Sequence, residues 1–121
     1  MPRILIVTGE ASGDLHGAHL VKALKELSPA LQIVGVGGAS MRAAGAELVK
    51  DIPQLDVMGL IGLSAVKTML QRISRIRTLI KGERWDLVVL IDNPGLNFHF
   101  ARVARACGLK VLYYIAPQVW A

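Results

Sequence analysis

Four short runs of apolar residues, each followed by a turn that contains glycine or proline, constrain the fold of this chain more than any other feature. The runs are rich in leucine and β-branched residues, and they alternate very little with polar residues. Continuous apolar runs of this length are typical of parallel strands whose two faces are both covered by helices. We therefore expect strands at Arg3–Val7, Ile33–Val36, Asp86–Ile91 and Lys110–Ile115.

Segments with helical periodicity separate these runs. Alternating strands and helices predict an α/β fold with a doubly wound, mainly parallel sheet, formed by one domain over residues 1–121. The expected helices are Asp14–Leu27, Ser40–Ala44, Ser64–Lys81 and Phe98–Cys107, with a weak further strand at Ala46–Val49. No helix follows the last expected strand, so we expect the domain to be incomplete at its C-terminal end and to belong to a longer protein.

The expected sheet places its turns at one edge. Ligands of doubly wound sheets bind outside the carboxyl ends of the strands. We therefore predict the functional site from the segments that follow the strands, which are Thr8–Gly13, Gly35–Gly38, Asp92–Asn97 and Ala116–Trp120.

The first of these turns carries two carboxylates, Glu10 and Asp14. Its glycines follow the spacing G-x-x-x-G-x-x-x-G, which matches neither the dinucleotide fingerprint nor the Walker loop. A turn that only grips phosphate should avoid carboxylates, so this one is predicted to handle a sugar, a hydroxyl group or a proton. Asp14 and Ser12 also have an interpretation as helix N-caps, and we favour that interpretation for Asp14.

Asp92 is the strongest single candidate for catalysis. It directly follows an apolar run, where partial desolvation raises the basicity of a carboxylate toward that of a general base. In the alternative interpretation, Asp92-Asn93-Pro94 is only the turn that starts the next helix. His16 and His19 lie three residues apart with no third ligand nearby, so no metal site is expected, although His16 stands near the predicted edge.

Basic residues concentrate in one segment, residues 57–82, which contains five of them and no acidic residue and so supplies the whole net charge of +5. One interpretation is a helix that faces the core through Leu63, Val66, Met69, Leu70, Ile73, Ile76 and Ile80. The other, which we favour, is contact with an anionic membrane surface. The residues expected to make that contact are Leu60, Ile61, Leu63, Lys67 and Arg72.

Other classes of partner are disfavoured. The basic segment lacks the aromatic residues that stack on bases, so nucleic acid is not expected. A nicotinamide cofactor would require an acidic residue after the second strand, where Gly37 and Gly38 stand. No apolar run reaches the roughly 18–20 residues of a membrane-spanning helix. The single cysteine, Cys107, is expected to pack in the fold, and a cytoplasmic setting is the default.

Several motifs together resemble the lipid-A-disaccharide synthase family of GT-B glycosyltransferases. The matching segments are Gly9-Glu10-Ala11-Ser12-Gly13-Asp14, Val57-Met58-Gly59, Ile91-Asp92-x-Pro94-x-x-Asn97 and Tyr114-x-x-Pro117-x-Val119-Trp120-Ala121. They occur in the order and at the spacing of the family. The resemblance implies a Rossmann-like domain that forms the N-terminal, acceptor-side half of a GT-B fold.

The resemblance also implies a hexosyltransferase of lipid A biosynthesis that needs neither metal nor cofactor. Its substrates would be UDP-2,3-diacylglucosamine as donor and 2,3-diacylglucosamine 1-phosphate as acceptor, and it would work at the inner face of the cytoplasmic membrane as a peripheral protein. Asp92 would be the general base, with Glu10 assisting. The residues expected to bind substrate are Gly9, Ser12, Gly13, His16, Met58, Gly59 and Asn97.

The chain departs from the family pattern at a few positions. Gly62 stands where the family commonly has an acidic residue, and Asn93, Gly95 and Leu96 interrupt the usual Asp-Ala-Pro-Asp-Phe-Asn sequence. Two alternatives therefore stay open, namely a related transferase with another acceptor and a non-catalytic, membrane-associated homologue that binds sugar or lipid. The oligomeric state is also left open.

Overall fold

The computed structural model describes residues 2–8, 11–49, 63–91 and 94–114, and for residues 11–14, 63–65 and 94–96 it describes the backbone alone. Within these ranges the strands are β1 (Arg3–Thr8), β2 (Gln32–Val36), β3 (Glu47–Leu48), β4 (Leu87–Ile91) and β5 (Val111–Tyr114). The helices are α1 (Ala11–Leu27), α2 (Ala39–Ala44), α3 (Leu63–Gly82) and α4 (Pro94–Ala106). Every expected strand and helix is present.

The helix starts differ from the prediction in two places. Helix α1 already includes Ala11, so Ser12 and Asp14 both lie inside its first turn, and the interpretation of either residue as the N-cap is wrong. Helix α4 begins at Pro94 rather than Phe98. Proline suits the first helical position because its fixed φ is helical. An N–H at that position would have no partner within the helix, so nothing is lost by its absence.

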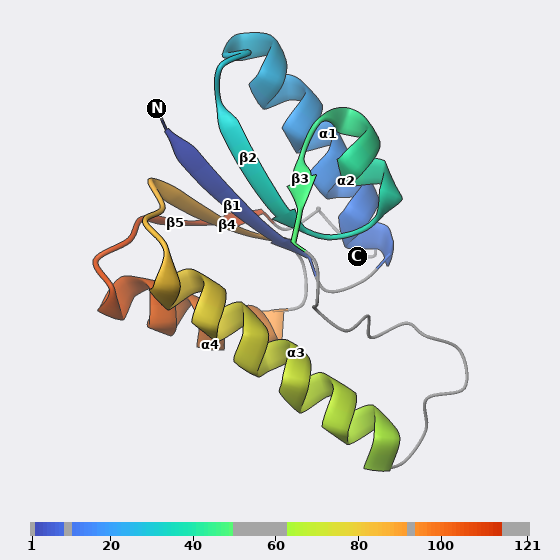
Figure 1. The fold of residues 1–121 in the computed structure, drawn as a ribbon, viewed down its shortest axis with the longest axis vertical. Helices are drawn as coiled ribbons and strands as arrows, with labels where there is room; N and C mark the ends of the chain where they lie inside the picture. Colours follow the sequence, from blue (N-terminus) through green and yellow to red (C-terminus); the bar gives the residue numbers. More distant parts are fainter. Residues whose placement is uncertain (1, 9–10, 50–62, 92–93, 115–121) are drawn as a thin grey trace, which may run out of the picture.

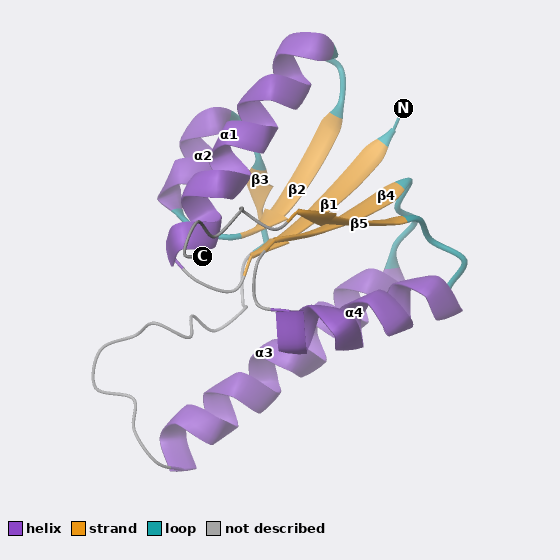
Figure 2. Ribbon diagram, turned by 180° about the vertical axis from the view of Figure 1, so that it is seen from behind, coloured by secondary structure: helices purple, strands orange, loops and turns teal. Residues whose placement is uncertain are grey.

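The sheet is parallel throughout its described strands, in the order β3-β2-β1-β4-β5. The chain moves outward from β1 through β2 to β3, then crosses to the other side of β1 and continues through β4 to β5. Helices α1 and α2 cover one face and α3 and α4 cover the other (Figures 1 and 2). The predicted doubly wound α/β fold is confirmed.

Strand β1 lies at the centre and is buried on both faces. Leu5 and Val7 pack in the cluster that includes Ile76 and Ile80 of α3, whereas Ile4 and Ile6 pack on the opposite face in the cluster that includes Val21 of α1. Because both faces of the strand are covered, the apolar run shows no alternation with polar residues.

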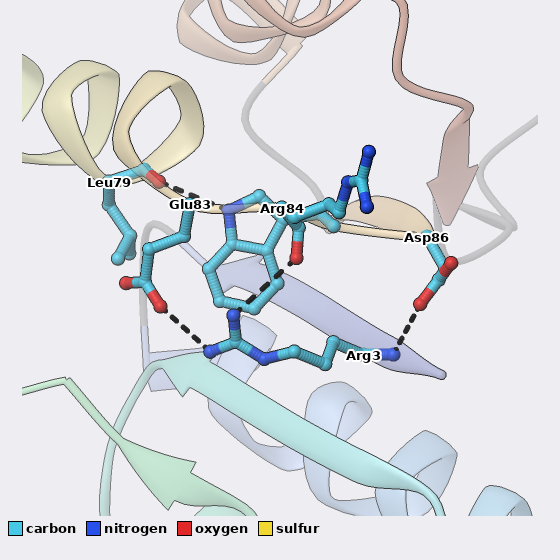
Figure 3. Close-up of polar contacts among 6 residues, drawn as sticks. Arg3, Leu79, Glu83, Arg84 and Asp86 are labelled. Carbon is cyan, nitrogen blue, oxygen red and sulfur yellow. Dashed lines mark hydrogen bonds and ion pairs between the residues drawn. The ribbon is translucent and has the colours of Figure 1, made fainter. Parts of the chain in front are cut away.

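The amino end of β1 is held by Arg3 (Figure 3). Its backbone N–H donates to Asp86 Oδ2 at 2.6 Å, and its Nη2 forms a 2.7 Å ion pair with Glu83 Oε1. The guanidinium carbon lies 4.5 Å from the ring centroid of Trp85, within the range of a cation–π contact. Arg3 therefore ties the first strand to the connection between α3 and β4.

Two glycines make room for Met41, which is fully buried. A Cβ on Gly17 of α1 would stand 2.6 Å from the Met41 sulfur, and one on Gly35 of β2 would stand 2.5 Å from its terminal methyl. Gly17 thus allows the close packing of α1 against α2, and a Cβ there would force the buried Met41 side chain to shift. In contrast, a Cβ on Gly82 at the end of α3 would meet no atom within 4 Å.

We predict that Gly17→Ala lowers the free energy of unfolding by about 1–2 kcal/mol, because overpacking against Met41 outweighs the helix propensity gained by alanine. Gly82→Ala is the matched control, and it should change the free energy by no more than about 0.5 kcal/mol. Urea unfolding of both variants checks the prediction. An unchanged or raised stability for Gly17→Ala would contradict this account of α1 packing.

Candidate functional site

The carboxyl ends of β1, β2 and β4 lie side by side. Thr8, the last residue of β1, pairs in register with Ile91, the last residue of β4, and Val7 pairs with Val36, the last residue of β2. The chain therefore continues toward Gly9 and toward Asp92 from the ends of neighbouring strands. Gly9, Glu10, Asp92 and Asn93 themselves lie outside the described residues.

Buried side chains satisfy the last carbonyl of each of these three strands. The Thr8 hydroxyl donates to Val36 O at 2.8 Å, the Asn97 amide Nδ2 donates to Ile91 O at 3.2 Å, and the Arg72 guanidinium donates to Thr8 O through Nη2. In the described part of the chain, Thr8 (2% exposed), Asn97 (3%) and Arg72 (6%) are the buried residues with polar or charged side chains. All of them lie at this one edge of the sheet.

A second polar contact supports Asn97 from strand β5. The Tyr113 hydroxyl donates to the Asn97 carbonyl oxygen at 3.1 Å. Burial raises the pKa of Tyr113 above its ordinary value of 10.0, because the ionised form loses solvation. The start of α4 is thus fixed from both β4 and β5.

Comparison with known proteins identifies the family. The model of the family described as lipid-A-disaccharide synthetase matches residues 4–121. The chain belongs to this family. Among named lipid-A-disaccharide synthases, the one from Geobacter metallireducens is 48% identical over 120 residues and the one from Coxiella burnetii strain Dugway 5J108-111 is 44% identical over 119. Each alignment covers 98% of this chain and 31% or 32% of the relative, so the chain spans about a third of these curated relatives.

Solved structures share the fold at low sequence identity. MurG from Acinetobacter baumannii matches with a TM-score of 0.61 and 14% identity, over all of this chain and 37% of that one. The C-terminal domain of PF1911 hydrogenase from Pyrococcus furiosus matches with a TM-score of 0.66 and 21% identity, over 93% of this chain and 91% of that one. These likenesses support the Rossmann-like architecture of this lipid-A-disaccharide synthetase family member.

Two residues have positions that differ from those expected. Arg72 was expected at a membrane surface, but it is buried, and its guanidinium is engaged at the carboxyl end of β1. Asn97 was expected to bind substrate, but it is buried and its amide nitrogen donates to the Ile91 carbonyl oxygen. The sequence does contain a signal for Arg72, because it precedes the buried Ile76 and Ile80 at intervals of four residues and so shares their helix face.

The remaining predicted site residues are described only in part. Ser12 and Gly13 lie in the first turn of α1, at the edge that carries the site. His16, in the next turn, is half-buried, and its ring centroid lies 6.2 Å from that of Tyr114. Met58, Gly59, Leu60, Ile61 and Gly62 lie outside the described residues. Among the residues that are described, no three histidine, cysteine, aspartate or glutamate side chains gather where they would hold a metal ion.

Cys107, expected to pack in the fold, is exposed. It follows the end of α4 and precedes Gly108, whose positive φ of 78° ends the helix. The tight turn brings the chain back into β5 and leaves the cysteine side chain at the surface.

We predict that Tyr113→Phe lowers the free energy of unfolding by about 1 kcal/mol at neutral pH, because the Asn97 carbonyl loses its donor. Since the folded pKa of Tyr113 is raised, the unfolded chain loses this proton first, and stability falls as the pH rises above 10.0. In Tyr113→Phe this contribution to the loss of stability at alkaline pH should be absent. Tyr114→Phe is the control, and unfolding in urea across an alkaline pH series is the measurement. An unchanged pH dependence in Tyr113→Phe would contradict the assignment.

Proposed function

We propose that this chain is the N-terminal, acceptor-side domain of a hexosyltransferase that makes lipid A disaccharide 1-phosphate. The donor is UDP-2,3-diacylglucosamine, the acceptor is 2,3-diacylglucosamine 1-phosphate, and UDP is released. The family match over residues 4–121 is the observation that carries this proposal. The donor nucleotide binds mostly in a second, C-terminal half of the GT-B fold, so the domain alone does not turn over.

In the proposed reaction Asp92 is the general base. It takes the proton of the acceptor hydroxyl while the hydroxyl oxygen attacks the anomeric carbon of the donor, and UDP leaves from the opposite side with inversion. Asp92 directly follows Ile91, a fully buried residue of a central strand, and carboxylates at such positions are partly desolvated. Glu10 follows the neighbouring strand by two residues and orients the sugar.

The substrate-binding residues of this proposal come from the segment after β1, from the first two turns of α1 and from the segment before α3. They are Gly9, Ser12, Gly13, His16, Met58 and Gly59. The first-turn N–H groups of α1 point toward the same edge, where a helix N-terminus favours oxygen atoms that carry negative charge. Neither a metal ion nor a cofactor takes part.

We assign the membrane contact to the first half of α3. Val66, Met69 and Leu70 are 53%, 42% and 61% exposed, whereas Ile76 and Ile80 in the second half are buried. The sequence pattern predicted apolar residues facing the core along the whole of α3, and this prediction is therefore correct only for the second half of the helix. In Figures 1 and 2 the beginning of α3 extends well past the sheet and α4.

Lys67 is exposed beside these apolar side chains, as expected for a helix that meets anionic headgroups. Leu60, Ile61 and Leu63 continue the apolar sequence before it. No helix in the described ranges is long and apolar enough to cross a bilayer. The proposed arrangement is peripheral, at the inner face of the cytoplasmic membrane, with the acylated substrates entering from the lipid.

The test of the reaction is UDP release by the full-length protein with both acylated substrates. Asp92→Asn should lower kcat at least about 100-fold, within the usual range for loss of a general base. Asp86→Asn is the matched control, because Asp86 precedes β4 at the opposite edge of the sheet, and its kcat should stay near that of the wild type. Full activity in Asp92→Asn would refute the mechanism.

The membrane assignment predicts that Val66→Ser, Met69→Ser and Leu70→Ser together weaken binding to vesicles containing anionic phospholipid at least about tenfold, because the apolar area available for burial falls. Lys67→Gln should weaken the binding further and reduce its dependence on anionic lipid. Leu27→Ser, at an exposed leucine at the end of α1, is the control that should bind as the wild type does. Co-sedimentation measures all of them, and unchanged binding of the triple variant would exclude this surface.

A further inference from the structure

We infer that Arg72 is a positioning residue of the proposed site. Its guanidinium holds the last peptide of β1 in place, and through it the turn that carries Gly9 and Glu10. This inference rests on the proposed function for its kinetic consequence, but its structural consequence is independent of any reaction.

The contact lies at the point where the turn begins. The Thr8 carbonyl oxygen that accepts from Arg72 belongs to the peptide unit that joins Thr8 to Gly9. The other polar group of Thr8, its hydroxyl, is engaged with Val36 O at 2.8 Å. Arg72 thus fixes the direction in which the chain leaves the sheet.

The charge of Arg72 is the second part of the argument. Burying a guanidinium costs solvation free energy, and an apolar side chain of similar volume often gives equal or greater stability at such a position. Stability alone therefore does not explain an arginine that is 6% exposed. A neutral amide, that of Asn97, suffices to satisfy the corresponding carbonyl of Ile91 on the neighbouring strand.

The position of Arg72 gives the charge a role. Thr8 and Ile91 are partners in register, so the chain continues from Ile91 toward Asp92 on the strand next to the peptide that Arg72 holds. A positive charge buried at this edge favours negatively charged groups there, because screening by water is weak. We assign to Arg72 the task of holding the Thr8 peptide, from which the chain continues to Gly9 and Glu10, at the edge where the proposed reaction takes place.

Arg3 provides a matched comparison within the same strand. It anchors the opposite end of β1 to the segment after α3, through Glu83, the Arg84 carbonyl oxygen and the Trp85 ring. Both arginines therefore fix β1 to α3 or its continuation, but only Arg72 lies at the edge with the predicted catalytic residues. Arg3→Met is expected to destabilise the fold without acting on the turn.

The kinetic experiment compares Arg72→Met, Arg72→Lys and Arg3→Met in the full-length protein, at a temperature where melting curves show each variant folded. We expect Arg72→Met to lower kcat by about 10- to 100-fold with a smaller change in KM, because misplacement of a catalytic turn by about 1 Å has effects of this size. Arg72→Lys should recover part of the loss, and Arg3→Met should keep kcat within about twofold of the wild type.

Hydrogen–deuterium exchange of the same proteins without substrates tests the structural half. Arg72→Met should speed exchange of the amides in residues 9–14, whereas Arg3→Met should leave that segment as protected as in the wild type. If the wild type releases no UDP, the proposed reaction is wrong, and exchange still decides the role of Arg72. Exchange in residues 9–14 that is the same for Arg72→Met and Arg3→Met would overturn the inference, as would an unchanged kcat of Arg72→Met in an active protein.

Discussion

The attachment of β1 to α3 at both ends is the interaction on which the rest of this structure depends. Arg3 reaches from the strand to the connection after α3, and Arg72 reaches from α3 back to the other end of the strand. Between these contacts, Leu5 and Val7 pack in the same cluster as Ile76 and Ile80. Since β1 pairs with both β2 and β4, fixing it fixes the register of the two halves of the sheet.

The strands could be predicted from the sequence because strands covered on both faces require apolar residues at every position, and loops between them do not. The site was harder to predict. Arg72 and Asn97 are residue types that usually lie at the surface, and their burial depends on three strand carbonyls that come together only in the folded sheet. The spacing of Arg72 from Ile76 and Ile80 in the sequence indicates a buried position, but arginine as a residue type favours an exposed one.

Helix α3 has a buried half and an exposed half because it is longer than the strands it packs on. The apolar pattern of the helix carries no information about the length of the strands. A helix of 20 residues spans about 30 Å, whereas strands of five or six residues span about 17–20 Å. Part of the helix therefore extends beyond the sheet and has no strand to pack against. The apolar stripe of α3 is continuous in sequence, but the sheet covers only the part that contains Ile76 and Ile80. The stripe alone does not indicate which half remains uncovered.

The same architecture occurs in a hydrogenase domain and in MurG at low sequence identity, so the fold by itself does not specify chemistry. In this chain the predicted site lies at the ends of three strands, where the regular hydrogen bonding of the sheet stops. Each terminal carbonyl there needs a donor, and in this protein each accepts from a buried side chain. An edge held in this way keeps the ends of these three strands in fixed relation. Arg72 connects that edge to α3, and Met69 and Leu70, the exposed apolar residues just before it, belong to the same helix. Along α3, less than one helical turn therefore separates the surface proposed to meet lipid from Arg72, which holds the last peptide of β1.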